Sequence, residues 1–263
     1  MALQLPSQLF NRYRGKVMNV VKVVGMGPGS ESMMTQQAIQ ALEESDVIVG
    51  YTVYLDLLGD RFADKEFLST PMKQEAERCR MCFREALKGK KTSMICSGDA
   101  GVYGMASLMF EIREEMGIKA DEIGIEIIPG ITAAMSGAAV LGAPLNHDFC
   151  IISLSDLLTP WELIEKRLRA AAQGDFAIAI YNPSSKKRHD YLMKACDILL
   201  ETAGPDRACG YVRSIGREGE EYHTCTLAEL RETEVDMFTT VFIGNSQSRI
   251  MDGRLITPRG YKL

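Results

Sequence analysis

The chain has 263 residues, of which 46% are hydrophobic and 25% are charged, the proportions of a soluble globular protein. Its net charge of -5 gives no indication of a nucleic-acid partner. No apolar run approaches the roughly 20 residues that a membrane span requires, so no membrane partner is expected. Residues 1–18 mix polar and short apolar pieces, so we interpret them as an N-terminal extension and not as a signal peptide.

In the first half of the chain, strand-like and helix-like segments alternate, which predicts helices packed around a mostly parallel sheet. The expected strands are residues 20–24, 47–49, 67–69, 92–96 and 125–128. The expected helices are residues 35–45, 74–88 and 105–116. Small residues dominate the stretch after 131, and we place a domain boundary there, giving an N-terminal α/β domain over 19–131.

The second half, a C-terminal α/β domain over 132–250, continues the alternation but adds a hairpin. Expected strands are residues 150–154, 176–180, 208–212, 222–225 and 239–243. One helix is expected to begin at Thr159-Pro160, with the proline in its first turn, and another covers 191–201. The glycines of 216–219 favour an antiparallel turn, so this sheet is expected to be mixed. Residues 251–263 are interpreted as a C-terminal tail.

Seven cysteines without regular spacing favour a reducing cytoplasm over a disulfide framework. Cys79 and Cys82 form one CxxC pair inside the predicted helix 74–88. A metal or redox role stays open for this pair, but no second CxxC and no nearby histidine completes four ligands. We therefore expect two cysteines on a helix and no metal site.

A glycine-rich turn at residues 97–104 (Ser-Gly-Asp-Ala-Gly-Val-Tyr-Gly) joins an expected strand to an expected helix. Its bare backbone N–H groups and the carboxylate of Asp99 could approach a ligand closely. The alternative is an ordinary tight turn in which Asp99 caps the helix. Residues 25–29 (Gly-Met-Gly-Pro-Gly) lack the spacing of a dinucleotide fingerprint, although a rigid glycine loop could contact a flat substrate.

Several charged groups are candidates for chemistry or binding. His147 and Asp148 could serve as acid and base, or they could form only a local hydrogen bond. Positive side chains near strand ends, where open sheets collect ligands, are Lys186, Lys187, Arg188, Arg213 and Arg217.

Taken together, residues 25–29, 97–104, 128–133 and 216–220 resemble the ordered motifs of the tetrapyrrole methylases, which use S-adenosylmethionine. Five further runs, residues 49–55, 147–148, 152–161, 181–188 and 239–246, are similar to one branch of that family. Members of this branch methylate carbon 17 of precorrin-3B or cobalt-factor III, with ring contraction, in cobalamin biosynthesis.

The resemblance implies the two-domain fold of class III S-adenosylmethionine-dependent methyltransferases, with a mixed sheet flanked by helices in each domain. It also implies a homodimer, with the methyl donor in the cleft between the domains. The implied donor-binding residues are Gly98, Asp99, Ala100, Gly101, Val102, Tyr103, Gly104, Thr132, Ala133, Tyr181, Asn182, Arg213 and Ser214. The residues expected to face the tetrapyrrole are Gly25, Gly27, Pro28, Gly29, Lys186, Lys187, Arg188 and Arg217. His147 and Asp148 are the candidates for proton transfer during ring contraction, and no metal site is expected.

Two other functions remain open. A methylase of the same fold could act on RNA or on a translation factor, which predicts a basic trough or a protein-docking surface. A non-catalytic module that senses S-adenosylmethionine would bind the donor without turnover.

Overall fold

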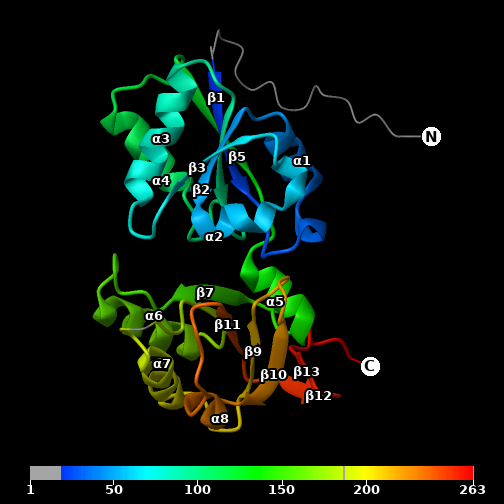
Figure 1. The fold of residues 1–263 in the computed structure, drawn as a ribbon. Helices are drawn as coiled ribbons and strands as arrows, with labels where there is room; N and C mark the ends of the chain where they lie inside the picture. Colours follow the sequence, from blue (N-terminus) through cyan, green and yellow to red (C-terminus); the bar gives the residue numbers. More distant parts are fainter. Residues whose placement is uncertain (1–18, 186, 263) are drawn as a thin grey trace, which may run out of the picture. The chain divides into compact units, whose positions relative to one another are not determined.

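The computed structural model describes residues 19–185 and 187–262 and divides the chain into two compact units (Figure 1). The first unit holds residues 31–131 with the segment that ends at Gly27, and the second holds residues 132 onward together with Pro28–Ser30. The predicted extension, residues 1–18, lies outside the described residues, as does Lys186.

The first unit is built on a five-stranded sheet with the order β3-β2-β4-β1-β5. Its strands are β1 (Asn19–Gly25), β2 (Val47–Tyr51), β3 (Glu66–Thr70), β4 (Thr92–Cys96) and β5 (Ile123–Ile128). All pairs between these strands are parallel, which confirms the parallel sheet predicted from the alternation of strands and helices. The mixed sheet that the resemblance implies for each domain is therefore wrong for this one. Parallel neighbours need long crossovers, and the intervening helices provide them.

Helices cover both faces of this sheet because its strands are apolar on both sides. On one face, α3 (Glu75–Leu87) and α4 (Ala106–Glu115) pack with strand residues such as Val23 and Met94. On the other, α1 (Gln36–Glu43) and α2 (Thr52–Leu55) pack with residues such as Ile48 and Ile95. Three short 3-10 turns complete the unit at Glu31–Met33, Asp56–Leu58 and Asp60–Phe62.

This winding creates a topological switch point between β1 and β4. The two strands are neighbours, yet the chain leaves β1 toward α1 on one face and leaves β4 toward α4 on the other. In open α/β sheets, ligands bind beyond the carboxyl ends of the strands at such a point. The loops that follow β1 and β4 carry the two glycine motifs found in the sequence.

The second unit is built on a five-stranded mixed sheet with the order β10-β9-β11-β8-β7. Its strands are β7 (Phe149–Ser153), β8 (Ala177–Tyr181), β9 (Ala208–Arg213), β10 (Glu221–Thr226) and β11 (Thr239–Ile243). β7 and β8 are parallel, and the other three pairs are antiparallel. The predicted hairpin is confirmed, since Tyr222 pairs with Val212 and Cys225 with Cys209.

One face of this sheet is covered by α6 (Trp161–Gln173), α7 (Tyr191–Leu200) and α8 (Leu227–Arg231). The opposite face carries α5 (Ala133–Leu141), with a small sheet made of β6 (Gly142–Ala143), β12 (Arg249–Met251) and β13 (Arg254–Ile256) nearby (Figure 1). Pro160 is the N-cap of α6 and lies just before the helix, one position earlier than expected.

Helix α5 and the β12–β13 hairpin are not among the elements predicted from the sequence. The Ala, Ser and Gly residues of α5 show little apolar periodicity, but they allow close packing: a Cβ on Gly137 would lie 2.9 Å from Phe242 Cζ. Residues 254–256, assigned to a tail from the sequence, pair with β6 in part and bury Leu255 completely. In the part of the chain described here, no helix has both the length and the apolarity needed to cross a membrane.

All seven cysteines are free thiols, not joined in disulfides, and five of them are buried. Cys79 and Cys82 lie on α3 and point into the core, as the CxxC-on-a-helix prediction requires. Burial raises the pKa of the Cys79, Cys96 and Cys196 thiols to about 12. Neutral thiols of this kind behave as small apolar groups and react slowly.

These pKa values predict a loss of stability at alkaline pH. A thiol in an unfolded chain titrates at about 8.5. Because the folded pKa is higher, the stabilising contribution of the neutral thiols is complete below about pH 8.5 and is lost as the pH rises from there. We expect the free energy of unfolding, measured by denaturant titration in reducing buffer, to fall between about pH 9 and about pH 11. The fall should be at most about 1.4 kcal/mol per pH unit for each thiol.

The Cys79→Ala and Cys196→Ala variants provide the control. Each removes one raised pKa, so each should fall less steeply with pH than the parent. Identical slopes in parent and variants would show that other groups cause the alkaline loss.

Candidate functional site

The glycine motifs of the first unit meet at the carboxyl ends of β1, β4 and β5. The Gly98 N–H donates to the Gly27 carbonyl at 2.7 Å, and the Gly27 N–H donates to the Gly98 carbonyl at 3.1 Å. A Cβ on Gly25 would lie 2.7 Å from Gly130 N, and a Cβ on Gly130 would lie 2.1 Å from Gly98 O. The three loops therefore approach so closely that only glycine fits between them. Gly130 is absent from the predicted site residues, although its motif, residues 128–133, was recognised.

Asp99 joins two of these loops. Its Oδ1 accepts a hydrogen bond from the Gly101 N–H at 2.8 Å, and its Oδ2 accepts one from the Gly130 N–H at 2.9 Å. The N-cap of α4 is Met105, without a side-chain capping bond, so the alternative in which Asp99 caps that helix is wrong. The carboxylate instead orders the loop that follows β4 and attaches it to the loop that follows β5.

The rest of this loop has unusual backbone geometry. A Cβ on Gly104 would lie 2.4 Å from the Ala100 carbonyl oxygen, to which the Ala106 N–H donates at 3.0 Å. Gly101 is exposed, and Tyr103 is 57% exposed with a φ of 53°. A left-handed tyrosine is uncommon, and such residues cluster at functional sites. Ala100 and Val102, the other predicted residues of this loop, lie on either side of Gly101 in the sequence.

In the second unit, the end of β8 carries two more of the predicted residues. The Tyr181 hydroxyl accepts a hydrogen bond from the Ala134 N–H at 2.7 Å and lies 2.6 Å from Thr132 Oγ1, which fixes the start of α5 beside Ala133. Asn182 follows with a φ of 53°, and its Nδ2 donates to Ser153 Oγ at 2.9 Å. Ser153 is not among the predicted site residues.

β7, β8 and β9 all end at one edge of the second sheet, because β11 is antiparallel to both β8 and β9. Ser214, which follows β9, also has a left-handed backbone, with a φ of 52°, and its N–H donates to the Phe238 carbonyl at 3.1 Å. The structure thus brings Ser153, Asn182 and Ser214 to one edge. In the first unit, Tyr103 lies in the loop that follows β4.

The positive side chains at this edge are engaged within the chain. Arg213 Nε lies 2.8 Å from Asp236 Oδ2, and its Nη1 lies 3.3 Å from Glu221 Oε1. Arg188 Nη1 pairs with Asp156 Oδ1 at 3.1 Å. Arg188 and Arg213 therefore do not present the unneutralised charge expected of them, while Lys187 is exposed and Lys186 lies outside the described residues.

The predicted loop 25–29 divides between the two units. Gly25 and Gly27 belong to the glycine junction of the first unit, whereas Pro28 and Gly29 pack on residues of the second. Arg217 Nε donates to the Pro28 carbonyl at 3.1 Å, and its guanidinium lies 5.7 Å from the centroid of the Phe238 ring. A Cβ on Gly29 would lie 2.8 Å from Gly216 O.

His147 and Asp148 lie just before β7, at the edge of the second sheet opposite Asn182. The Asp148 N–H donates to His147 Nδ1 at 2.9 Å, and the Asp148 side chain is 85% exposed. This is the local hydrogen bond that the sequence analysis left open. The role of His147 and Asp148 as acid and base of ring contraction stays a prediction.

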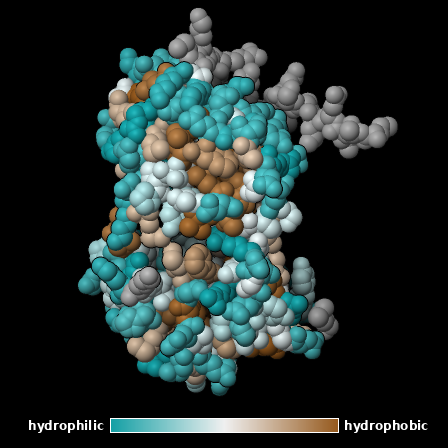
Figure 2. Space-filling view, in the orientation of Figure 1, coloured by the Kyte–Doolittle hydropathy of each residue, from teal (hydrophilic) through white to brown (hydrophobic). Residues whose placement is uncertain are grey.

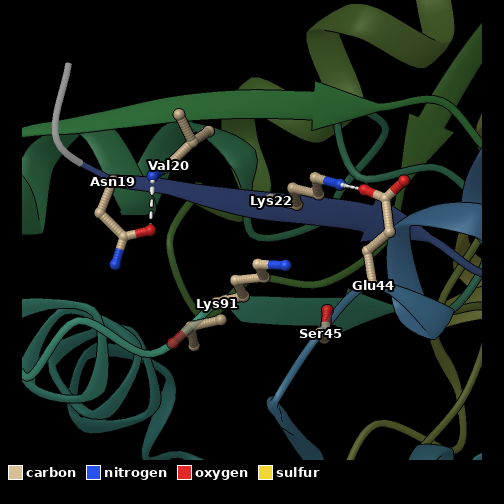
Figure 3. Close-up of a pocket in the computed structure, with 7 residues that line it drawn as sticks. Asn19, Val20, Lys22, Glu44, Ser45 and Lys91 are labelled. Atoms are coloured by element: carbon tan, nitrogen blue, oxygen red, sulfur yellow. Dashed lines mark hydrogen bonds and ion pairs between the residues drawn. The ribbon is translucent and has the colours of Figure 1, made fainter. Parts of the chain in front are cut away.

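A surface depression of about 200 Å³ lies at the amino ends of β1 and β4 (Figure 3). Asn19 and Thr92 line it, and its two facing charges, Lys22 Nζ and Glu44 Oε2, pair at 2.6 Å. Ligands of open parallel sheets bind at the other edge, so we do not assign it to the site. Across the described residues, no group of three or more His, Cys, Asp or Glu is arranged to hold a metal ion.

Comparison with known proteins gives a consistent result. The sequence model of the family described as Tetrapyrrole (Corrin/Porphyrin) Methylases matches residues 20–231. The probable cobalt-factor III C(17)-methyltransferase of Salmonella typhimurium is 44% identical over 244 residues, covering 93% of this chain and 100% of that protein. The precorrin-3B C(17)-methyltransferase of Sinorhizobium sp is 38% identical over 244 residues, covering 91% and 96% respectively.

A solved structure also matches. The crystal structure of the methyltransferase CobJ is similar with a TM-score of 0.84 at 38% identity, covering 91% of this chain and 100% of that chain. The family match, residues 20–231, includes the glycine junction, Asp99, Tyr181, Asn182 and Ser214.

The glycine junction leads to a stability prediction. Gly130→Ala should lower the free energy of unfolding by about 1–3 kcal/mol or more, because its methyl group would overlap the Gly98 carbonyl. Gly204→Ala is the matched control, since a Cβ there would meet no atom within 4 Å. Denaturant unfolding of both variants tests this, and equal stability of the two would contradict the packing described.

Proposed function

This chain belongs to the tetrapyrrole (corrin/porphyrin) methylases, and we propose that it methylates carbon 17 of cobalt-factor III or precorrin-3B, with ring contraction, in cobalamin biosynthesis. The observation that carries the proposal is the alignment of relatives bearing those two names over more than nine-tenths of this chain. The higher identity belongs to the relative named for cobalt-factor III, 44% against 38%, and favours that substrate. Methylation of RNA or a translation factor, or donor sensing alone, has no comparable support.

The methyl donor in this proposal is S-adenosylmethionine, which the family uses. Bound S-adenosylmethionine supplies a methyl group already activated on a sulfonium, so the protein mainly has to hold donor and acceptor in line. In the first unit, the exposed backbone at Gly101 can approach the donor, and Asp99 holds that loop in place. In the second unit, Thr132, Ala133, Tyr181, Asn182, Arg213 and Ser214 are proposed to contribute.

The 25–29 loop and the predicted positive side chains, Arg188 included, are proposed to serve the tetrapyrrole. His147 and Asp148 remain the proposed acid and base of ring contraction. The carboxylates of the tetrapyrrole require positive charge nearby, for which Lys187, Arg188 and Arg217 are the described candidates. Gly25, Gly27, Pro28 and Gly29 would supply the rigid loop that faces the macrocycle. Assembly as a homodimer belongs to the same proposal and is tested by analytical ultracentrifugation.

The direct test is incubation of the purified protein with S-adenosylmethionine and either cobalt-factor III or precorrin-3B, followed by mass spectrometry. We expect a product heavier by one methylene group, with a spectrum changed by ring contraction, and faster turnover of cobalt-factor III. Donor binding without turnover of either tetrapyrrole would overturn the proposal.

Asp99→Ala tests the donor site. The change leaves the Gly101 and Gly130 N–H groups without their acceptor, so the loop loses its fixed geometry. We expect the free energy of S-adenosylmethionine binding, measured by calorimetry, to weaken by about 1–3 kcal/mol.

Asp148→Ala is the matched control, because it removes a carboxylate from the edge of the second sheet opposite Asn182. Its donor affinity should equal that of the parent protein. Unchanged affinity in a folded Asp99→Ala variant would refute the role given to the loop.

A further inference from the structure

The loop between β7 and α6, residues 154–160, is anchored at its base. Leu154 is fully buried, and its N–H donates to the Tyr181 carbonyl at 2.9 Å, extending the pairing of β7 with β8. The Asp156 carboxylate is held on both oxygens: Arg188 Nη1 lies 3.1 Å from Oδ1, and the Tyr191 hydroxyl donates to Oδ2 at 2.7 Å. These contacts fix where the next residues of the loop are presented.

The residues presented are two adjacent leucines without partners in the core. Leu157 is 64% exposed and Leu158 is 98% exposed, the highest value among the large hydrophobic residues of the described chain. Apolar side chains lie in patches among polar ones over the face in view (Figure 2), and a single exposed leucine on a protein surface would be ordinary. Two neighbouring leucines on a loop held by a buried backbone bond and a charged clamp are not explained by packing within the chain.

The loop begins at the edge that carries the proposed site. Ser153, the last residue of β7, accepts the hydrogen bond from Asn182 Nδ2, and its Oγ also accepts from the Ser155 N–H at 3.2 Å. Asn182 is itself one of the left-handed residues at this edge. The leucines thus follow, within five residues, a group in direct contact with the predicted site.

We propose that Leu157 and Leu158 form an apolar platform for the tetrapyrrole macrocycle; this rests on the proposed function. A macrocycle has a broad carbon face, which suits two exposed leucines, and carboxylates at its rim, which require positive charge. Lys187 is exposed and directly precedes Arg188, the residue that pairs with Asp156 of this loop. The amino-acid and ribose parts of the methyl donor need hydrogen-bond and ionic partners, which leucines do not supply, whereas its adenine offers a much smaller flat surface than a tetrapyrrole. Apolar contact of this kind adds affinity with little directional requirement.

The experiment compares Leu158→Ser and the double variant Leu157→Ser/Leu158→Ser with the wild-type protein. We expect the KM for cobalt-factor III to rise about tenfold or more, as loss of buried leucine contact predicts, with the Kd for S-adenosylmethionine unchanged. Leu158→Met, which retains an apolar side chain, should keep KM near the parent value. Leu87→Ser is the control, because Leu87 is 57% exposed but ends α3, beside the amino end of β1.

The outcomes separate this proposal from the function on which it rests. No turnover of either tetrapyrrole by the wild-type protein overturns both. Turnover by the wild type with unchanged KM in the double variant overturns the platform alone. A parallel loss of donor affinity would show a structural role for the loop, and a changed sedimentation coefficient would show that the leucines contact a second copy; either result overturns the platform.

Discussion

The close approach of backbone at Gly25, Gly98 and Gly130 is the constraint on which the first unit's site depends. Parallel strands bring their carboxyl ends to one edge, and the opposite exits from β1 and β4 open that edge to a ligand. With no side chains in the way, the loops can bond directly to one another. Asp99 then spans two of them, so its position follows from backbone geometry established by the sheet.

In the second unit, side-chain hydrogen bonds hold the loops at the strand ends in place. A tyrosine hydroxyl, not a glycine contact, joins the end of β8 to the start of α5. Left-handed backbone at Asn182 and Ser214 turns the chain away from the sheet directly after the strands. Such conformations persist only where surrounding contacts enforce them, and the Asn182–Ser153 and Ser214–Phe238 hydrogen bonds are contacts of that kind.

Charge at the second unit's edge is largely balanced within the protein. Arg188 and Arg213 both pair with carboxylates, so their first role is to hold loops in position. Exposed ion pairs of this type contribute little to stability, but those of Arg188 select one arrangement of the loop that presents Leu157 and Leu158. In this unit, the ionic contacts of Arg188 therefore hold the loop on which the two exposed leucines lie.

Local sequence determined much of the secondary structure and the family. The strands at Thr92–Cys96 and Thr239–Ile243 have their predicted bounds, because short apolar runs bounded by polar residues depend on neighbouring positions alone. The ordered motifs likewise identified the tetrapyrrole methylases, since each motif is a contiguous run. By contrast, α5 was missed because small residues form a helix there through tertiary packing, without an apolar stripe of their own.

Only the tertiary structure decided what the individual side chains do. Asp99 bonds to Gly130, 31 positions away, and Arg188 to Asp156, 32 positions away, and no local pattern encodes such distant pairs. His147 and Asp148 are neighbours in sequence, but it is the direction of β7 that places them at the edge opposite Asn182. Residue types are a property of the chain, whereas their partners follow from strand order and direction, which depend on the whole sheet.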